Sequence, residues 1–316
     1  AVCMSLVAAR TKDLRARLVT AIPLTALLIA MVISAVTGSA SVHRVLFGAY
    51  SRATGLLSYT AMILIAIGLS ITVRKSTLNF TYVAIGAVAT FEVIYGFLQL
   101  VGADPIKWVN PYNPVIGSLG NPNFMSATLA FSSLAMVAVA LSSRPSKMVR
   151  ILSAILSACG LLMAWSTNSV QGPIAFAGGL TFLLGVFIWL KRPKSPLFIG
   201  YTSLAALMLG VVVLGVAKIG PLSDILYRYT LGIRTHYWGA AWHMMTANPL
   251  TGVGVDSYGE SYRAYRDLAF VQSNGPTLFS NAAHSVPLQL GATLGLPTFI
   301  LYIALQDMYY FGASRL

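Results

Sequence analysis

Charge is scarce in this chain of 316 residues: charged side chains make up 9% of it, and only eight of them are acidic. Cysteine is nearly absent, because only Cys3 and Cys159 occur, both inside apolar stretches. We interpret the two cysteines as small core residues and expect no disulfide. With 57% apolar residues and a mean hydropathy of +0.75, the composition excludes a soluble globular protein.

Long apolar runs fill the chain instead. About 20 apolar residues cross the hydrocarbon layer as a helix, and backbone groups in lipid must pair internally. The runs predict an all-α fold, a polytopic transmembrane helical bundle of about eight or nine spans that forms a single domain over 1–316. The expected spans lie near 19–37, 54–73, 78–101, 123–142, 151–167, 173–190, 197–216 and 284–304. The stretch 1–9 resembles the end of a further span, and the chain starts without Met, so we expect it to be truncated.

Basic residues in the short loops predict the orientation. One alternate set of loops carries Arg10, Lys12, Arg15, Arg17, Arg74, Lys75, Arg144, Lys147, Arg150, Lys191, Arg192 and Lys194. The opposite short loops carry only Arg44, Arg52 and Lys107. Because cytoplasmic loops are enriched in Lys and Arg, we expect the first set inside. The polar segment, residues 217–282, is then one large external helical loop, and the net charge of +13 reflects topology rather than nucleic-acid binding.

Two shorter segments on the same expected outer side suit a substrate groove. Gly102–Phe124 contains Asn-Pro steps, which favour turns, and Lys107, which suits an anionic headgroup or pyrophosphate. A compact reversal loop explains the same residues. Trp165–Pro173 offers Gln171 and several hydroxyl groups to a sugar or phosphate, but helix capping explains this segment as well.

The polar segment contains the strongest candidates for chemistry. Residues 234–245 are predicted to form a helix with Arg234, Trp238 and Trp242 on one face. Arg234 suits a bidentate grip on phosphate, although an Arg beside Trp can also stack on the ring at a membrane surface. A second helix is expected to carry an aromatic stripe, interpreted mainly as a belt in the membrane interface. The stripe consists of Tyr258, Tyr262 and Tyr265.

Single titratable residues give two further hypotheses. His284 opens the last apolar run at the expected outer surface, where an imidazole exchanges protons near neutral pH; a structural role at a helix start is the alternative. Glu92 lies inside a span, and we favour a hydrogen-bonded structural residue over a proton relay in a carrier. No Cys and His cluster has metal-ligand spacing, so no metal or cofactor is expected.

Taken together, these motifs resemble the O-antigen ligase and O-antigen polymerase superfamily over about residues 80–305. The matching elements are Gly117–Phe124 with Asn121 and Asn123; Arg234 and Trp238 with 248–254; and Ala283–His284 with Leu288–Gln289 and Leu294–Gly295. Two positions depart from the family pattern. Gln171 stands where the family has an Arg and cannot neutralise a phosphate, so Arg228 or Lys107 is expected to supply that charge. Ser285 stands where the family has an Asn.

The resemblance implies a metal-independent glycosyltransferase of the bacterial cytoplasmic (inner) membrane, active at the outer face in cell-envelope polysaccharide synthesis. The donor would be a glycan on a polyprenyl (undecaprenyl) pyrophosphate, and the acceptor a hydroxyl of a lipid or another glycan. His284 would be the general base, and Arg234 would stabilise the leaving group. The residues expected to bind substrate are Arg228, Lys107, Asn121, Asn123, Gln171 and Trp238.

Three alternatives remain open from the sequence. A polymerase that extends a lipid-linked glycan shares the same motifs. A transporter or flippase is favoured by Glu92 and the many spans, but the chain has no internal repeat and no second buried acid. A membrane scaffold without catalytic activity would tolerate substitution of Arg234 and His284.

Overall fold

The computed structural model of the chain is helical throughout the part that it describes. No strand occurs among the described residues, so the predicted all-α class is confirmed for them. The chain divides into two compact units: Ala1–Ser76 with Val213–Leu316 form the first, and Thr77–Val212 form the second. A single transmembrane domain over 1–316 stays a prediction. The described residues are 21–38, 40–50, 52–72, 78–108, 115–220, 222–227 and 232–314.

Helices of the second unit pack around α7, which contacts α6, α8 and α9. The helices are α6 (Leu78–Leu100), α7 (Pro122–Leu141), α8 (Lys147–Ser166), α9 (Gln171–Lys191) and α10 (Pro196–Val216), of which 213–216 fall in the first unit. Small residues allow close helix crossings, as is common within membranes. A methyl group on Gly172 of α9 would lie 2.1 Å from Ser126 Oγ of α7, so this crossing has no room for a larger side chain.

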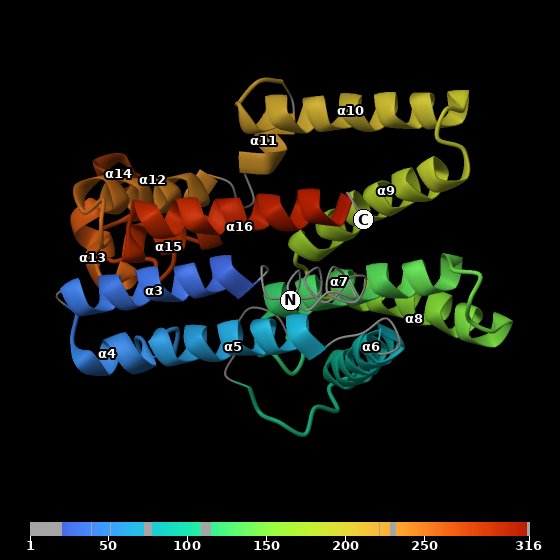
Figure 1. The fold of residues 1–316 in the computed structure, drawn as a ribbon, viewed down its shortest axis with the longest axis horizontal. Helices are drawn as coiled ribbons and strands as arrows, with labels where there is room; N and C mark the ends of the chain where they lie inside the picture. Colours follow the sequence, from blue (N-terminus) through green and yellow to red (C-terminus); the bar gives the residue numbers. More distant parts are fainter. Residues whose placement is uncertain are drawn as a thin grey trace. The chain divides into compact units, whose positions relative to one another are not determined.

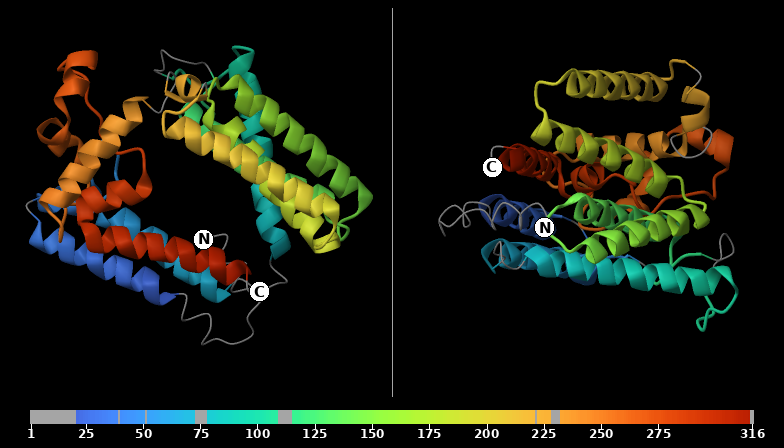
Figure 2. Two further views of the ribbon diagram at one scale, coloured as in Figure 1. Left: turned by 90° about the horizontal axis from the view of Figure 1, so that it is seen from above. Right: turned by 90° about the vertical axis from the view of Figure 1, so that its right-hand side faces the viewer.

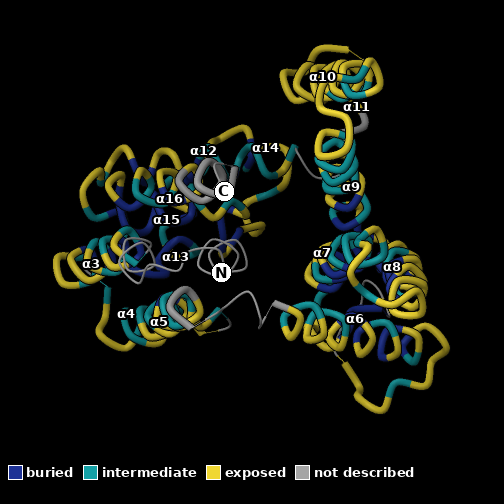
Figure 3. The backbone as a smooth tube through the Cα atoms, turned by 45° about the vertical axis from the view of Figure 1, so that its right-hand side comes forward, coloured by how far each residue is buried: buried dark blue, intermediate teal, exposed yellow. Residues whose placement is uncertain are grey.

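Five described helices, α6 to α10, are long and apolar enough to cross a membrane. Apolar stretches of α3, α5 and α16 are shorter, so the predicted total of spans stays a prediction. Figure 3 shows that α10 is exposed along most of its length, as expected where apolar side chains meet lipid. The core position predicted for Cys159 is wrong, since this free thiol is exposed on α8. Cys3 lies outside the described residues.

Three longer helices form the body of the first unit. They are α3 (Ala21–Thr37), α5 (Leu56–Thr72) and α16 (Leu296–Ser314). Helix α3 packs between α5 and α16, and the three lie side by side (Figures 1 and 2). Their shared core includes Leu27, Met31, Ile63 and Leu305. The short helix α4 (Val42–Phe47) connects α3 to the stretch before α5.

The polar segment adds helices α12 (Gly232–Ala247), α13 (Tyr258–Tyr265) and α14 (Leu268–Asn274), which lie with α15 (Val286–Leu294) at one end of this body (Figure 1). The short helix α11 (Leu222–Leu226) precedes them in the segment. Both helices predicted within the segment are confirmed as α12 and α13. The start predicted for the last span is wrong, because Gly295 adopts φ +90° and separates α15 from α16. The apolar helix therefore begins at Leu296 rather than at His284.

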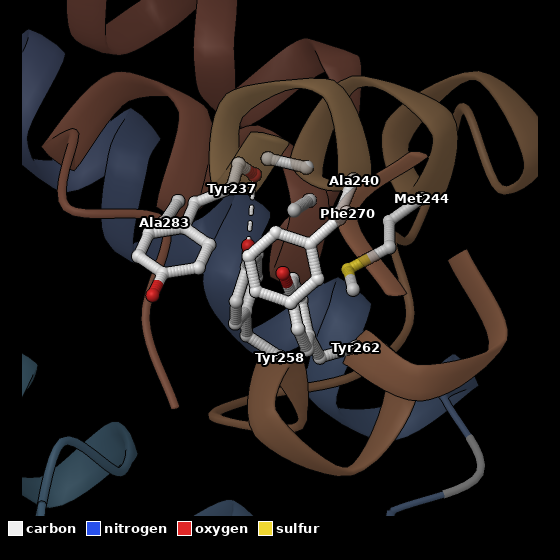
Figure 4. Packing of buried hydrophobic residues seen from close by; sticks show 9 residues of the cluster. Tyr237, Ala240, Met244, Tyr258, Tyr262, Phe270 and Ala283 are labelled. Carbon is white, nitrogen blue, oxygen red and sulfur yellow. Dashed lines mark hydrogen bonds between the residues drawn. The ribbon is translucent and has the colours of Figure 1, made fainter. Parts of the chain in front are cut away.

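The aromatic stripe of α13 faces protein, not lipid. Tyr258 and Tyr262 are fully buried against Tyr237 and Met244 of α12 and Phe270 of α14 (Figure 4). The Tyr258 hydroxyl donates a hydrogen bond to the carbonyl of Tyr237 at 2.8 Å. The interface belt predicted for these two tyrosines is therefore wrong: they form the core on which the polar segment folds.

Candidate active site

His284 lies in the His284 loop, residues 280–285, which runs into α15. Ala283 is buried in the aromatic core, and its N–H donates to Gln289 Oε1 of α15 at 2.8 Å (Figure 4). The Ser280 hydroxyl donates to the carbonyl of Ala282 at 2.7 Å. His284 adopts φ +53°, a left-handed conformation that few residues other than glycine take. The loop therefore fixes the backbone on both sides of an exposed imidazole.

Arg234 lies on α12, three residues before Tyr237, whose ring is 5.6 Å from the His284 ring between centroids. The Arg234 side chain is half-buried, and no hydrogen bond or ion pair joins it to another described residue. Trp238, one turn further along α12, has a buried indole N–H with no acceptor in the described part of the chain. Both groups therefore keep unused hydrogen-bond donors.

Arg52 contacts the His284 loop, a position that the sequence did not predict. It follows α4, and its Nε donates to Asp256 Oδ1 at 3.2 Å while its Nη1 donates to the carbonyl of Asn281 at 3.0 Å. Asp256 also accepts a hydrogen bond from the N–H of Ala49 at 2.7 Å. The pair joins positions 204 residues apart, so no local spacing could have revealed it.

The protonation of His284 follows from these neighbours. Partial burial of the ring lowers the pKa of His284 below its ordinary value, and the positive charges of Arg234 and Arg52 lower it further. The imidazole is therefore neutral at neutral pH and can accept a proton. No hydrogen bond to the ring occurs among the described residues, so both ring nitrogens remain open to a ligand.

The turn at residues 249–254 attaches to the end of α15 through its backbone. The N–H of Val253 donates to the carbonyl of Ala292 at 2.9 Å, and the N–H of Leu296 donates to the carbonyl of Pro249 at 2.7 Å. The last carbonyls of a helix lack partners within the helix, and this turn satisfies two of them, those of Ala292 and Thr293. It thereby connects α12, which carries Arg234, to α15, which follows His284.

Gly252→Ala tests how much this attachment stabilises the fold. Gly252 adopts φ +66°, and an added Cβ would lie 2.4 Å from the carbonyl carbon of Thr293. We expect the substitution to cost about 1–3 kcal/mol from backbone strain, and more from the clash. The midpoint of thermal unfolding in detergent measures it. Gly239→Ala on α12, where an added Cβ meets nothing within 4 Å, is the control and should not lower the midpoint. Equal midpoints for the two variants would contradict the prediction.

The remaining histidines of the polar segment have other partners. His236 Nδ1 lies 2.7 Å from Asp267 Oδ2, and Asp267 also caps α14 by accepting from the N–H of Phe270. His243 lies 3.4 Å from the carbonyl of Tyr265. Across the described residues, no group of three or more His, Cys, Asp or Glu side chains is arranged to hold a metal ion.

The other predicted site residues belong to the second unit. Asn121 caps α7 by accepting from the N–H of Asn123 at 2.9 Å, and Asn123 Oδ1 accepts from the Ser169 hydroxyl at 2.8 Å. The structure thus joins the Asn-Pro element, residues 117–124, to the polar hinge, residues 165–173, at the start of α9. Gln171 is the first residue of α9 and is half-buried, and Lys107 is exposed in the loop after α6. Arg228 lies outside the described residues.

Glu92 supports the loop before α7. Its buried carboxylate accepts hydrogen bonds from the hydroxyl and the N–H of Ser118. Gly117 adopts φ +62°, and an added Cβ would lie 2.5 Å from Glu92 Oε2, so glycine is needed there. These contacts agree with the structural role favoured for Glu92.

The fold and the site define an all-helical integral membrane protein in which the charges of two arginines act on one histidine. The model of the O-antigen ligase family matches residues 152–303, which confirms the predicted resemblance to the O-antigen ligase superfamily. The match supports a membrane enzyme related to O-antigen ligases and polymerases. No curated protein and no solved structure matches the chain.

The family match covers part of the predicted site. It runs from α8 into α16 and includes Gln171, Arg234, Trp238 and His284. Asn121, Asn123 and Lys107 precede it, as does Arg52. The family match thus includes the hinge, α12 and the His284 loop, whereas the resemblance of the Asn-Pro element rests on its motif alone.

Proposed function

We propose that the protein transfers a glycan from a polyprenyl pyrophosphate carrier, such as undecaprenyl pyrophosphate, to an acceptor hydroxyl at the outer face of the bacterial cytoplasmic membrane. The observation that carries this proposal is that Arg234, which has no ion-pair partner among the described residues, places its charge on a neutral His284 in a segment matched by the O-antigen ligase family. The acceptor is a sugar hydroxyl on a lipid core or on another glycan.

The proposed reaction separates two charges. The acceptor oxygen attacks the anomeric carbon of the donor sugar and forms the new glycosidic bond. The bond from that carbon to the pyrophosphate breaks, and its electron pair stays on the leaving oxygen. A cation placed where this charge develops lowers the barrier most. Arg234 is suited to this role because its guanidinium offers several donors and has no partner among the described residues.

His284 is suited to take the proton of the acceptor hydroxyl. A general base must be unprotonated at the working pH and within hydrogen-bond reach of the proton. The lowered pKa of His284 supplies the first condition, and the exposed position of the loop supplies access. We propose Trp238 as a further substrate contact on the motif resemblance. On the motif resemblance we propose additional contacts from Arg228, Lys107, Asn121, Asn123 and Gln171.

A transfer assay with the purified protein in nanodiscs tests the proposal. The protein is mixed with a polyprenyl-pyrophosphate-linked glycan and either a lipid-core acceptor or a second lipid-linked repeat unit. Product on the lipid core identifies a ligase, and a lengthened lipid-linked glycan identifies a polymerase. Uptake of the donor into liposomes without any new glycosidic bond would instead identify a transporter and contradict the proposal.

Transfer should not require a metal ion. The sequence contains no Asp-x-Asp motif, and we propose that arginine takes the charge of the leaving group. Addition of a chelator such as EDTA should therefore leave the transfer rate unchanged. A rate that falls with chelator and returns on addition of a divalent cation would contradict this prediction.

A further inference from the structure

We propose that Arg52 is a binding residue for the pyrophosphate of the donor, and that it supplies the second positive charge of the site. This inference rests on the proposed function. A lipid pyrophosphate carries more negative charge than a single guanidinium neutralises. Among the described residues, Arg234 and Arg52 are the two cations whose charge acts on His284, and they come from different elements.

The position of Arg52 is set by contacts on two sides. Asp256 holds its Nε, and the carbonyl of Asn281, in the His284 loop, accepts from its Nη1. The Asp256 side chain is only 2% exposed, whereas that of Arg52 is 20% exposed. The carboxylate is therefore fixed within the fold, and part of the guanidinium remains open. No partner for Arg52 Nη2 occurs among the described residues.

Close packing gives Asp256 this fixed position. It adopts φ +51°, and a Cβ on Gly48 would lie 2.7 Å from its Oδ2. The N–H of Ala49 donates to the same oxygen. The stretch between α4 and α5 thus folds around one carboxylate and presents Arg52 toward the His284 loop. An arginine held in this way loses little conformational freedom when it binds a phosphate.

Arg44 provides a control for Arg52. Arg44 of α4 forms an ion pair with Glu260 of α13, and its side chain is 25% exposed, close to the value for Arg52. Its charge is not among those that shift the pKa of His284. Arg44→Gln therefore removes an ion pair, to a more exposed carboxylate, and the same net charge from the protein without removing a charge that acts on His284.

Binding of undecaprenyl pyrophosphate and undecaprenyl monophosphate to the protein in nanodiscs tests the proposal. The wild type should prefer the pyrophosphate, and Arg52→Gln should reduce this preference by about tenfold or more, as expected for a lost hydrogen bond to a charged group. Arg44→Gln should keep the wild-type preference. An unchanged preference in Arg52→Gln would overturn the proposal.

Asp256→Asn distinguishes a role of the Arg52 charge from a structural role of the ion pair between Arg52 and Asp256. It breaks the same ion pair as Arg52→Gln but leaves the positive charge in place, so the preference for pyrophosphate should be kept or increased. Equal losses in the two variants would assign Arg52 a structural role only. Because Arg52→Gln leaves a buried carboxylate unpaired, the double variant Arg52→Gln/Asp256→Asn repeats the test without that charge and should also lose the preference.

Different results would contradict the role of Arg52 and the proposed function. A wild type that binds neither lipid and transfers no glycan would contradict the function itself. A wild type that binds the pyrophosphate and transfers glycan, together with an unchanged Arg52→Gln variant, would contradict only the role of Arg52.

Discussion

His284→Asn and His284→Ala should each reduce glycan transfer by about 10²–10⁴-fold, the usual contribution of a positioned general base. Neither replacement can accept the proton of the acceptor hydroxyl. Asn is the more informative of the two, because it tolerates the left-handed backbone conformation at φ +53° that strains Ala. A loss shared by both variants is therefore a loss of the imidazole rather than of the loop conformation.

The measurement is the initial rate of transfer at saturating donor, with thermal unfolding as a check on folding. His243→Ala is the control, because His243 is exposed on α12 and the hydrogen-bond partner of its ring is the carbonyl of Tyr265, outside the proposed site. Its rate should match the wild type. Wild-type turnover in His284→Asn would remove His284 from the proposed mechanism.

The pH dependence of the wild type follows from the same residue. Burial and two positive charges lower the pKa of His284, so the imidazole stays neutral until the pH falls below the ordinary histidine value of about 6.5. Transfer should therefore be constant around neutral pH and should decline on the acidic side of that value. This acidic decline should be absent from the residual activity of His284→Asn.

Arg234→Gln should reduce transfer by about 10²–10³-fold, as expected when a donor to a developing negative charge is removed. Arg234→Lys should recover only part of this loss, because a point charge does not reproduce the fork of a guanidinium. Arg234 has no ion-pair partner among the described residues, so neither substitution leaves a carboxylate unpaired there. A loss of transfer is then attributable to a lost contact with the substrate rather than to misfolding.

Transfer rates of the wild type, Arg234→Lys and Arg234→Gln, measured with the same lipid-linked donor, test whether activity falls in that order. Arg263→Lys is the control: Arg263 lies on α13 with its guanidinium 5.8 Å from the ring centre of Phe279, and it is exposed. That variant should keep the wild-type rate. Near-normal transfer in Arg234→Lys would assign Arg234 an electrostatic or structural role without bidentate contact.

Local sequence patterns predicted the helices well. Apolar runs of membrane length define α6 to α10, and the 3.6-residue periodicity around Arg234 defines α12. The same periodicity put Tyr258 and Tyr262 on one face of α13. It could not say whether lipid or protein covers that face, because both are apolar, and the structure shows protein.

Contacts between distant residues could not be predicted in the same way. The pairing of Arg52 with Asp256 and the attachment of the 249–254 turn to α15 depend on tertiary folding alone. The break at Gly295 was also missed, because the apolar composition continues across it while the backbone turns. Motif order and residue type pointed to His284 and Arg234, whose catalytic roles stay predictions.

The buried tyrosines of the polar segment have a consequence for how the membrane influences the reaction. Arg234 and His284 are positioned by a protein interior built from Tyr237, Tyr258, Tyr262 and Phe270, and not by the depth of side chains in lipid. A thicker or thinner bilayer would change how the isoprenoid chain of the carrier reaches this interior. In the proposed reaction, lipid composition would therefore act on access of the carrier more than on the placement of the guanidinium and the imidazole.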